Sequence, residues 1–164
     1  MIITIARQCG CHGDEIGLKL AKEYGLSFYN KEHIIKLAKE KGIYDKFPYF
    51  FSEIPVNALM HTISDDEGDI LLSESRKALY PLIGDESCVI IGRCANYAFS
   101  DRQDKISIFL SGDKSDRIRH IARSMILVKR RRRLLLTKLI QEEESFINTV
   151  QTRSGAMQLF MICV

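Results

Sequence analysis

The chain has 164 residues, of which 46% are hydrophobic and 27% are charged, and its formal net charge is +3. These values are ordinary for one globular domain with a buried core, and they argue against a disordered or fibrous chain. The small net charge argues neither for nor against a nucleic-acid partner, and the lack of an apolar run near 18 residues predicts no membrane span.

The first elements follow a strand, helix, strand pattern. Residues 2–6, IITIA, form a short β-branched run that predicts a buried parallel strand. Apolar residues at helical spacing predict a helix over 13–24, with Gly25 as its C-cap. The inward stripe of this helix is expected at Ile16, Leu20, Ala21 and Tyr24. Residues 26–30, LSFYN, suggest a second short strand.

Later elements continue the alternation of helices and strands. They are a helix over 31–41 capped by Asn30, a helix over 70–83, strands over 88–92 and 105–110, and a basic helix after the last strand. The helix over 70–83 should bury Leu72, Ala78, Leu79 and Leu82. Residues 43–68, with two prolines and the aromatic run FPYFF, predict an irregular insertion with one helical turn. The alternation predicts a single α/β domain over residues 1–164, with helices on both faces of a parallel sheet.

The stretch IARQCGCHGDEIG, residues 5–17, places a glycine-rich turn between the first strand and the first helix. Such a turn directs backbone N–H groups at one point, where the helix dipole adds about half a positive charge, so it is typical of a phosphate-binding loop. The usual lysine is missing, since Gly13 and Asp14 stand where a Gly-Lys pair is expected. Arg7 and Lys19 are the nearest cations. An ordinary strand-to-helix turn is the alternative interpretation.

Three stretches, in this order, resemble the cytidylate kinase-like family of P-loop kinases: ITIARQCGCHGDEIGLKLAKEYGLSFYNKEHI, SCVIIGRCANYAF and ISIFLSGDKSDRIRHI. The resemblance covers most of residues 1–123 and implies a P-loop kinase fold, with a three-layer parallel sheet flanked by helices. It implies ATP with Mg²⁺ as the phosphoryl donor and a nucleoside monophosphate, CMP or dCMP, as the acceptor. The family usually has Gly-Ser-Gly-Gly-Arg where this chain has GCHGD, so His12 and Asp14 depart from its pattern.

The resemblance also implies roles for the loop and for Arg93. The donor phosphates would lie against Arg7, Gly10, Cys11, His12 and Gly13. Arg93, at the end of the strand over 88–92, would hold the acceptor phosphate beside the insertion at 43–68. No serine or threonine follows the loop to bind Mg²⁺, and although Glu15 stands near that position, the metal ligands stay unassigned. Arg93 as a surface ion-pair residue is the alternative, and Cys94 is expected to be a packed small residue.

Three arginines follow the strand over 105–110. By the resemblance, Arg117, Arg119 and Arg123 begin a mobile lid over 117–145 and neutralise charge on the transferring phosphoryl group. Arg117 and Arg119 are two residues apart and cannot share a helical face, so at most one of them should point inward. A solvated basic helix is the alternative.

The tail after Arg123 departs from the family pattern. Read one frame over, Met157–Gln158 must encode Ala and Met161–Ile162 must encode Asp, while 154–157 can encode Trp-Gly-Asp just before that Ala. The family is expected to carry Trp-Gly-Asp and then Tyr-Asp-Leu, so the pattern indicates a shift of reading frame near residues 124–125, whether natural, cloned or conceptual. The tail as written alters the lid and the last strand, although LFMICV is apolar enough to pair as an edge strand.

Two other functions stay open. The chain could bind nucleotide without catalysis, because Asp14 repels phosphate. It could instead bind nucleic acid or another anionic partner through the basic run Lys129–Arg133, although this run lacks interleaved aromatic residues, which disfavours nucleic acid. The five cysteines have no metal-ligand spacing, and Cys9 and Cys11 form C-x-C without a second pair, which argues against a zinc site there. We expect reduced thiols and a cytoplasmic protein, and a homodimer is left open.

Sequencing the gene across codons 120–164 tests the frame hypothesis. We expect the alternative frame to be open after residues 124–125 and to encode Trp-Gly-Asp-Ala and then Tyr-Asp-Leu. Early stop codons in that frame, or a different residue before the forced Ala, would show that the tail is the true reading.

Overall fold

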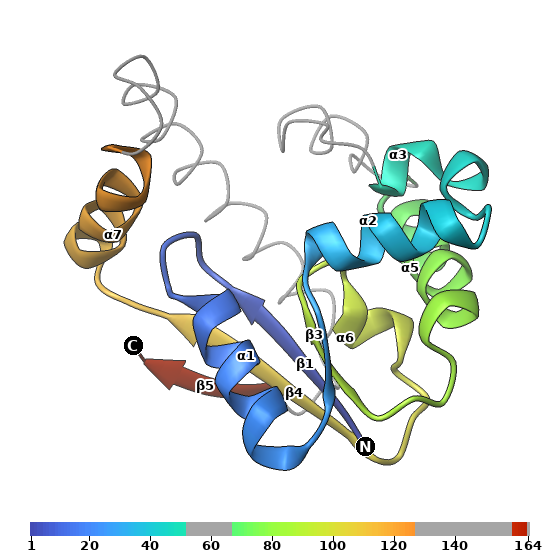
Figure 1. The fold of residues 1–164 in the computed structure, drawn as a ribbon, viewed down its shortest axis with the longest axis horizontal. Helices are drawn as coiled ribbons and strands as arrows, with labels where there is room; N and C mark the ends of the chain where they lie inside the picture. The colour runs from blue at the N-terminus through green and yellow to red at the C-terminus, as the bar shows by residue number, and fades with distance from the viewer. Residues whose placement is uncertain (52–66, 127–158, 164) are drawn as a thin grey trace.

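The computed structural model describes residues 1–51, 67–126 and 159–163. Within them, one sheet of five parallel strands runs in the order β2-β3-β1-β4-β5 (Figure 1). The strands are β1 Ile2–Arg7, β2 Ser27–Tyr29, β3 Cys88–Ile91, β4 Lys105–Ser111 and β5 Leu159–Cys163. The predicted parallel α/β fold is confirmed. The apolar tail segment pairs with β4 as an edge strand, as its composition predicts.

Alternate residues of β1 and β3 enter two separate hydrophobic clusters, one on each face of the sheet. One cluster contains Ile3, Ile5, Val89 and Ile91, and the other contains Ile2, Cys88 and Ile90. Successive side chains of a strand point to opposite faces, so these strands are covered on both sides, as parallel strands require. The sheet is therefore the middle layer of three.

Helix α1, Gly13–Tyr24, covers one face and packs its Ala21 into the cluster that contains Ile3. It ends at Gly25, whose left-handed conformation and N–H bonds to preceding carbonyls confirm the predicted C-cap. Tyr24 is 60% exposed, so its assignment to the inward stripe is wrong. The reason is its position as the last helical residue, where the chain turns back toward β2.

Four helices and one 3₁₀ turn lie on the other side: α2 Lys31–Glu40, η1 Tyr44–Lys46, α3 Pro48–Phe51, α5 Glu67–Ile83 and α6 Ala95–Ala98. The Asn30 side chain accepts a hydrogen bond from the His33 N–H at 3.1 Å, which confirms the predicted cap of α2. In α5, three of the four predicted core residues are buried, namely Ala78, Leu79 and Leu82. The side chain of Leu72 lies outside the described residues.

The predicted irregular insertion is more ordered and more buried at its start than the sequence suggests. η1 and α3 lie within it, and α5 already begins at Glu67. Phe50 and Phe51 are 4% and 0% exposed and belong to the same cluster as Ile2. The aromatic run therefore contributes to the hydrophobic core, because burial of two large aromatic rings removes a large apolar area from water.

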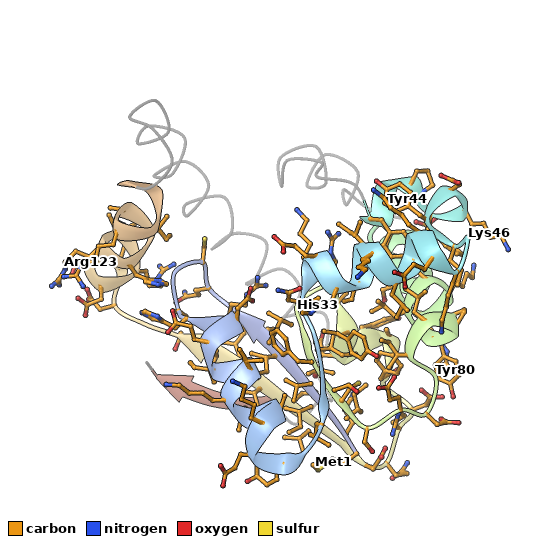
Figure 2. The ribbon with its side chains drawn as sticks, in the orientation of Figure 1. Met1, His33, Tyr44, Lys46, Tyr80 and Arg123 are labelled. Carbon is orange, nitrogen blue, oxygen red and sulfur yellow. The ribbon has the colours of Figure 1, made fainter. Side chains whose placement is uncertain are left out.

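Helix α7, Lys114–Ile126, is the predicted basic helix after β4. Figure 2 shows Arg123 on this helix at the opposite end of the molecule from Tyr44 and Lys46. None of the helices in the described part of the chain is both long and apolar enough to cross a membrane.

Helix α1 approaches the sheet closely at Gly17. A Cβ atom at this position would lie 2.5 Å from Ile91 Cδ1 and 3.0 Å from Phe28 Cε2. The absence of a side chain therefore sets the distance between α1 and the strands, and with it the position of the helix N-terminus.

We expect Gly17→Ala to destabilise the protein by about 1–3 kcal/mol, because overpacking outweighs the gain of about 0.8–1 kcal/mol in helix propensity. The measurement is the free energy of unfolding in urea. Leu18→Ala, next to it and 42% exposed, is the matched control and should change stability by about 0.5 kcal/mol or less. A Gly17→Ala variant as stable as the wild type would show that the helix can move away from Ile91 without cost.

Candidate functional site

The carboxyl ends of the parallel strands meet at one edge of the sheet. From β1 the chain continues through α1 to β2, which lies on one side of β1 in the strand order. β4 lies on the other side of β1. This arrangement creates a switch point between β1 and β4, where open α/β sheets bind their ligands. Among the described residues, the non-glycine residues with positive φ are His12, Arg93 and Cys94, and all three lie in loops at this edge. Strained backbone that gathers at one edge supports a functional site there.

The loop between β1 and α1 is fixed against the turn after β4. The Gln8 N–H donates to the Leu110 carbonyl at 2.9 Å, and Gln8 Oε1 accepts from the Gly112 N–H at 3.2 Å. Gly10 has φ 90°, and a Cβ atom there would lie 2.7 Å from the backbone oxygen of Arg117. Only glycine fits such a conformation and such a contact. Gly10 therefore lets the loop pack directly on the backbone of α7.

The first turn of α1 has backbone N–H groups without partners in the helix. His12 occupies the N-cap position in the left-handed conformation, and its side chain makes no capping hydrogen bond. The first helical bond is donated by the Ile16 N–H to the His12 carbonyl at 3.0 Å, so the preceding N–H groups of this helix, Gly13, Asp14 and Glu15, have no partner within it. These donors and the helix dipole together make a phosphate-binding geometry. Cys11 contributes backbone alone, because its side chain is 2% exposed within the core.

The side chain of Arg7 lies next to the loop. A Cβ atom at Gly13 would lie 3.0 Å from Arg7 Cδ, and one at Gly92 would lie 2.7 Å from Arg7 Nη1. The side chain of Arg7 thus runs between the start of α1 and the end of β3. The sequence places Arg7 beside the loop, and the tertiary structure adds that Gly92 leaves room for its guanidinium.

Arg93 links the end of β3 to α3. Its Nη1 donates to the Phe50 carbonyl, and its guanidinium carbon lies 5.9 Å from the centre of the Phe50 ring. Arg93 therefore contacts the start of the segment predicted to lie on the acceptor side. Its neighbour Cys94 has a thiol whose pKa burial raises to about 11, an effect that the positive charge of Arg93 opposes. A neutral thiol agrees with the expected packing role of Cys94 rather than with a nucleophile.

The three arginines of α7 have different surroundings. Arg117 is 3% exposed, and its Nε and Nη1 donate to the carbonyls of Gly112 and Cys9 at 3.2 and 3.3 Å. Arg119 is exposed and pairs with Asp116 one turn away, and Arg123 is also exposed. As the spacing predicts, Arg117 points inward and Arg119 does not. Arg117 contacts the β1–α1 loop through the Cys9 carbonyl.

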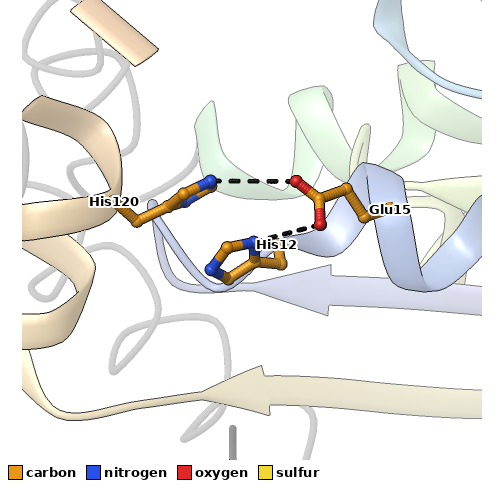
Figure 3. A group of neighbouring side chains, drawn as sticks. All are labelled: His12, Glu15 and His120. Carbon is orange, nitrogen blue, oxygen red and sulfur yellow. Dashed lines mark ion pairs between the residues drawn. The ribbon is translucent and has the colours of Figure 1, made fainter. Parts of the chain in front are cut away.

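Two histidines and one carboxylate meet beside the loop. His12 Nδ1 lies 3.3 Å from Glu15 Oε2, and His120 Nε2 lies 3.9 Å from Glu15 Oε1 (Figure 3). No local pattern in the sequence points to His120, because it meets the loop across more than 100 residues of chain.

Several predicted features lie outside the described residues. They are the basic run Lys129–Arg133, the lid beyond residue 126 and residues 52–66 of the insertion. None of the four cysteines in the described residues, Cys9, Cys11, Cys88 and Cys94, takes part in a disulfide. Burial also raises the pKa of the Cys88 thiol, to about 12, and the charge of Glu86 adds to this effect.

The chain is similar in sequence to one known family. The sequence model of the cytidylate kinase-like family matches residues 2–157, a range that extends beyond residues 1–123, which the resemblance in the sequence covers. No curated protein matches the chain.

Solved structures share the fold. An uncharacterized protein from Eubacterium ventriosum ATCC 27560 is 25% identical, with a TM-score of 0.60 and coverage of 100% of this chain and 88% of that chain. A gluconokinase from Sinorhizobium meliloti 1021 is 14% identical, with a TM-score of 0.55 and coverage of 99% and 81%. A shikimate kinase from Bacteroides thetaiotaomicron is also 14% identical, with a TM-score of 0.51 and coverage of 98% and 84%. At 14% identity, the two kinases show a common fold.

We expect Arg117→Met to destabilise the protein by about 2–4 kcal/mol, because two carbonyls lose a charged donor in a buried position. Urea unfolding provides the measurement. The matched control, Arg119→Met, removes an exposed ion pair and should change stability by about 0.5 kcal/mol or less. If Arg117→Met were as stable as the wild type, the guanidinium would not be holding the loop.

Proposed function

Because this chain belongs to the cytidylate kinase-like family, we propose that it transfers the γ-phosphoryl group of ATP to a nucleoside monophosphate, with CMP or dCMP as the favoured acceptor. The observation that carries the proposal is the N-terminus of α1, which has no side-chain cap, with Arg7 lying between it and the end of β3. Backbone donors and a guanidinium at one point suit the phosphates of a nucleotide.

The donor phosphates would contact the backbone at Gly10–Gly13 and the first turn of α1. Arg7 would supply the positive charge that a lysine supplies in other P-loop enzymes. In phosphoryl transfer the protein mainly positions the reactants and neutralises charge on the transferred group. A guanidinium held between two glycines serves both purposes, because close packing limits its movement.

The acceptor phosphate would bind Arg93. A guanidinium presents several donors in one plane, a geometry that suits paired bonds to the oxygens of a phosphate. The contact with α3 supports this assignment because it joins the end of β3 to the predicted acceptor segment. Arg117 would act as a positioning residue through the loop, whereas the exposed Arg119 and Arg123 are the candidates that could reach the transferring group from the lid.

The described residues at the site offer contacts for the phosphates of a nucleotide, but they include no complete set of ligands for its metal ion. Mg²⁺ is usually held by one or two carboxylates, water and the substrate phosphates. Asp14, exposed in the first turn of α1, offers a carboxylate to such an ion. When bound, Mg²⁺ supplies positive charge to the β and γ oxygens of ATP.

A nucleotide-binding protein without catalysis is the second candidate. The observation that favours it is the acidic first turn of α1, where Asp14 and Glu15 stand next to the proposed phosphate site. Negative charge at this position opposes the approach of a triphosphate. The two candidates differ in turnover and agree in nucleotide binding.

A coupled assay of ADP release, with ATP, Mg²⁺ and a panel of monophosphates, tests the proposal on the full chain. We expect turnover with a pyrimidine monophosphate. Arg7→Met and Arg93→Met should each lower kcat/KM by about 10- to 100-fold, the effect of one lost charged hydrogen bond. Arg93→Met should raise the KM of the acceptor more than that of ATP.

The same substitution at Arg76 serves as the control. Arg76 is exposed on α5 and pairs with Asp101, so Arg76→Met should retain wild-type kinetics. Binding of ATP without turnover on any monophosphate would favour the inactive binder. If ATP did not bind at all, both candidates would be wrong.

A further inference from the structure

We propose that His12, Glu15 and His120 form a binding site for a divalent transition-metal ion, with Zn²⁺ as the best match, that joins the β1–α1 loop to α7. One ligand atom from each of the three residues lies within 4.8 Å of the others (Figure 3). His12 and Glu15 come from the start of α1, and His120 comes from α7, so an ion bound here would connect two elements that are distant in sequence. The inference goes beyond the kinase proposal and does not depend on it.

The ligand atoms lie somewhat farther apart than a bound zinc ion would hold them. Bonds of about 2.0–2.1 Å to nitrogen and oxygen place tetrahedral ligands about 3.3 Å apart. His12 Nδ1 lies 3.3 Å from Glu15 Oε2 and His120 Nε2 lies 3.9 Å from Glu15 Oε1, so these contacts use different carboxylate oxygens, and one atom from each residue fits within 4.8 Å. The side chains of His12, Glu15 and His120 are 39%, 64% and 30% exposed, so they have room for the small rotations that would complete the site.

The second ring nitrogen of His120 provides independent support. Its Nδ1 lies 3.1 Å from the carbonyl oxygen of Gly10. A carbonyl can only accept a hydrogen bond, so Nδ1 carries the proton, and in a neutral ring Nε2 then has the free lone pair. Nε2 is the atom that faces Glu15. Metal-binding histidines almost always donate their other N–H to a carbonyl or carboxylate in this way, which fixes both the tautomer and the ring orientation.

The donor set indicates which ion would bind. Two imidazoles and one carboxylate suit zinc and its neighbours in the first transition row, whereas Mg²⁺ and Ca²⁺ prefer oxygen ligands. Three protein ligands leave a fourth position for water or another oxygen ligand. Since His12 belongs to the phosphate loop and His120 to α7, binding would fix the loop against this helix.

Titration of the full chain with Zn²⁺ alone, in competition with a chromophoric chelator, tests the proposal. We expect one zinc ion per chain with micromolar affinity or better. His120→Ala, His12→Asn and Glu15→Gln should each weaken binding by at least tenfold, since loss of an outer hydrogen-bond partner alone typically costs about 10- to 100-fold. His33→Ala, on α2 and exposed, is the matched control and should bind as the wild type does.

Two further measurements keep the test valid if a variant folds poorly. In the wild type, which has four histidines, Zn²⁺ should shift the ring-proton NMR signals of His12 and His120 and leave those of His33 and His61 in place. The Co²⁺ complex should show d–d bands without the near-ultraviolet band of a cobalt–thiolate bond. A thiolate band, equal binding by the variants and the wild type, or no binding at micromolar zinc would overturn the proposal.

Discussion

The contact between Gly10 and the backbone of Arg117 is the constraint on which the rest of the site depends. A Cβ atom at Gly10 would overlap the backbone of α7, so the loop can lie against this helix only if residue 10 has no side chain. Arg117 strengthens the contact, because its buried guanidinium donates to carbonyls of the loop and of the turn after β4. The position of the β1–α1 loop therefore depends on the strand and helix that follow it by about a hundred residues, as well as on its own sequence.

Two electrostatic effects at the start of α1 act on anion binding in opposite directions. The helix dipole favours negative charge at this end, and Asp14 and Glu15 already satisfy part of that preference. Glu15 lies against two histidines, and Asp14 faces the Asn30 amide at 3.5 Å. A phosphate at this position would therefore need a compensating cation. Arg7 can provide it, since its guanidinium lies beside Gly92 and the helix start.

The edge strand β5 shows which part of a fold tolerates a change of sequence. β5 pairs with β4 in parallel register from Ser107–Leu159 to Ser111–Cys163. Pairing at an edge depends mainly on backbone hydrogen bonds and on an apolar, β-prone composition, both of which LFMIC retains. Recognition depends on particular side chains, and those are lost if the frame hypothesis holds. Sheet formation and substrate recognition can therefore respond differently to the same alteration.

The sequence by itself determined the elements, the parallel α/β class and the candidate loop, because alternation, helical spacing and caps such as Asn30 act over a few residues. It also placed Arg7 and Arg93 at strand ends, since position along a parallel strand decides which edge of the sheet a residue reaches. Tertiary structure alone decided three other features: the burial of Phe50 and Phe51, the carbonyl contacts of Arg117, and the meeting of His120 with His12 and Glu15. These features require segments far apart in the chain to pack together, and the pattern within one segment carries no information about the residues that another segment will bring to it.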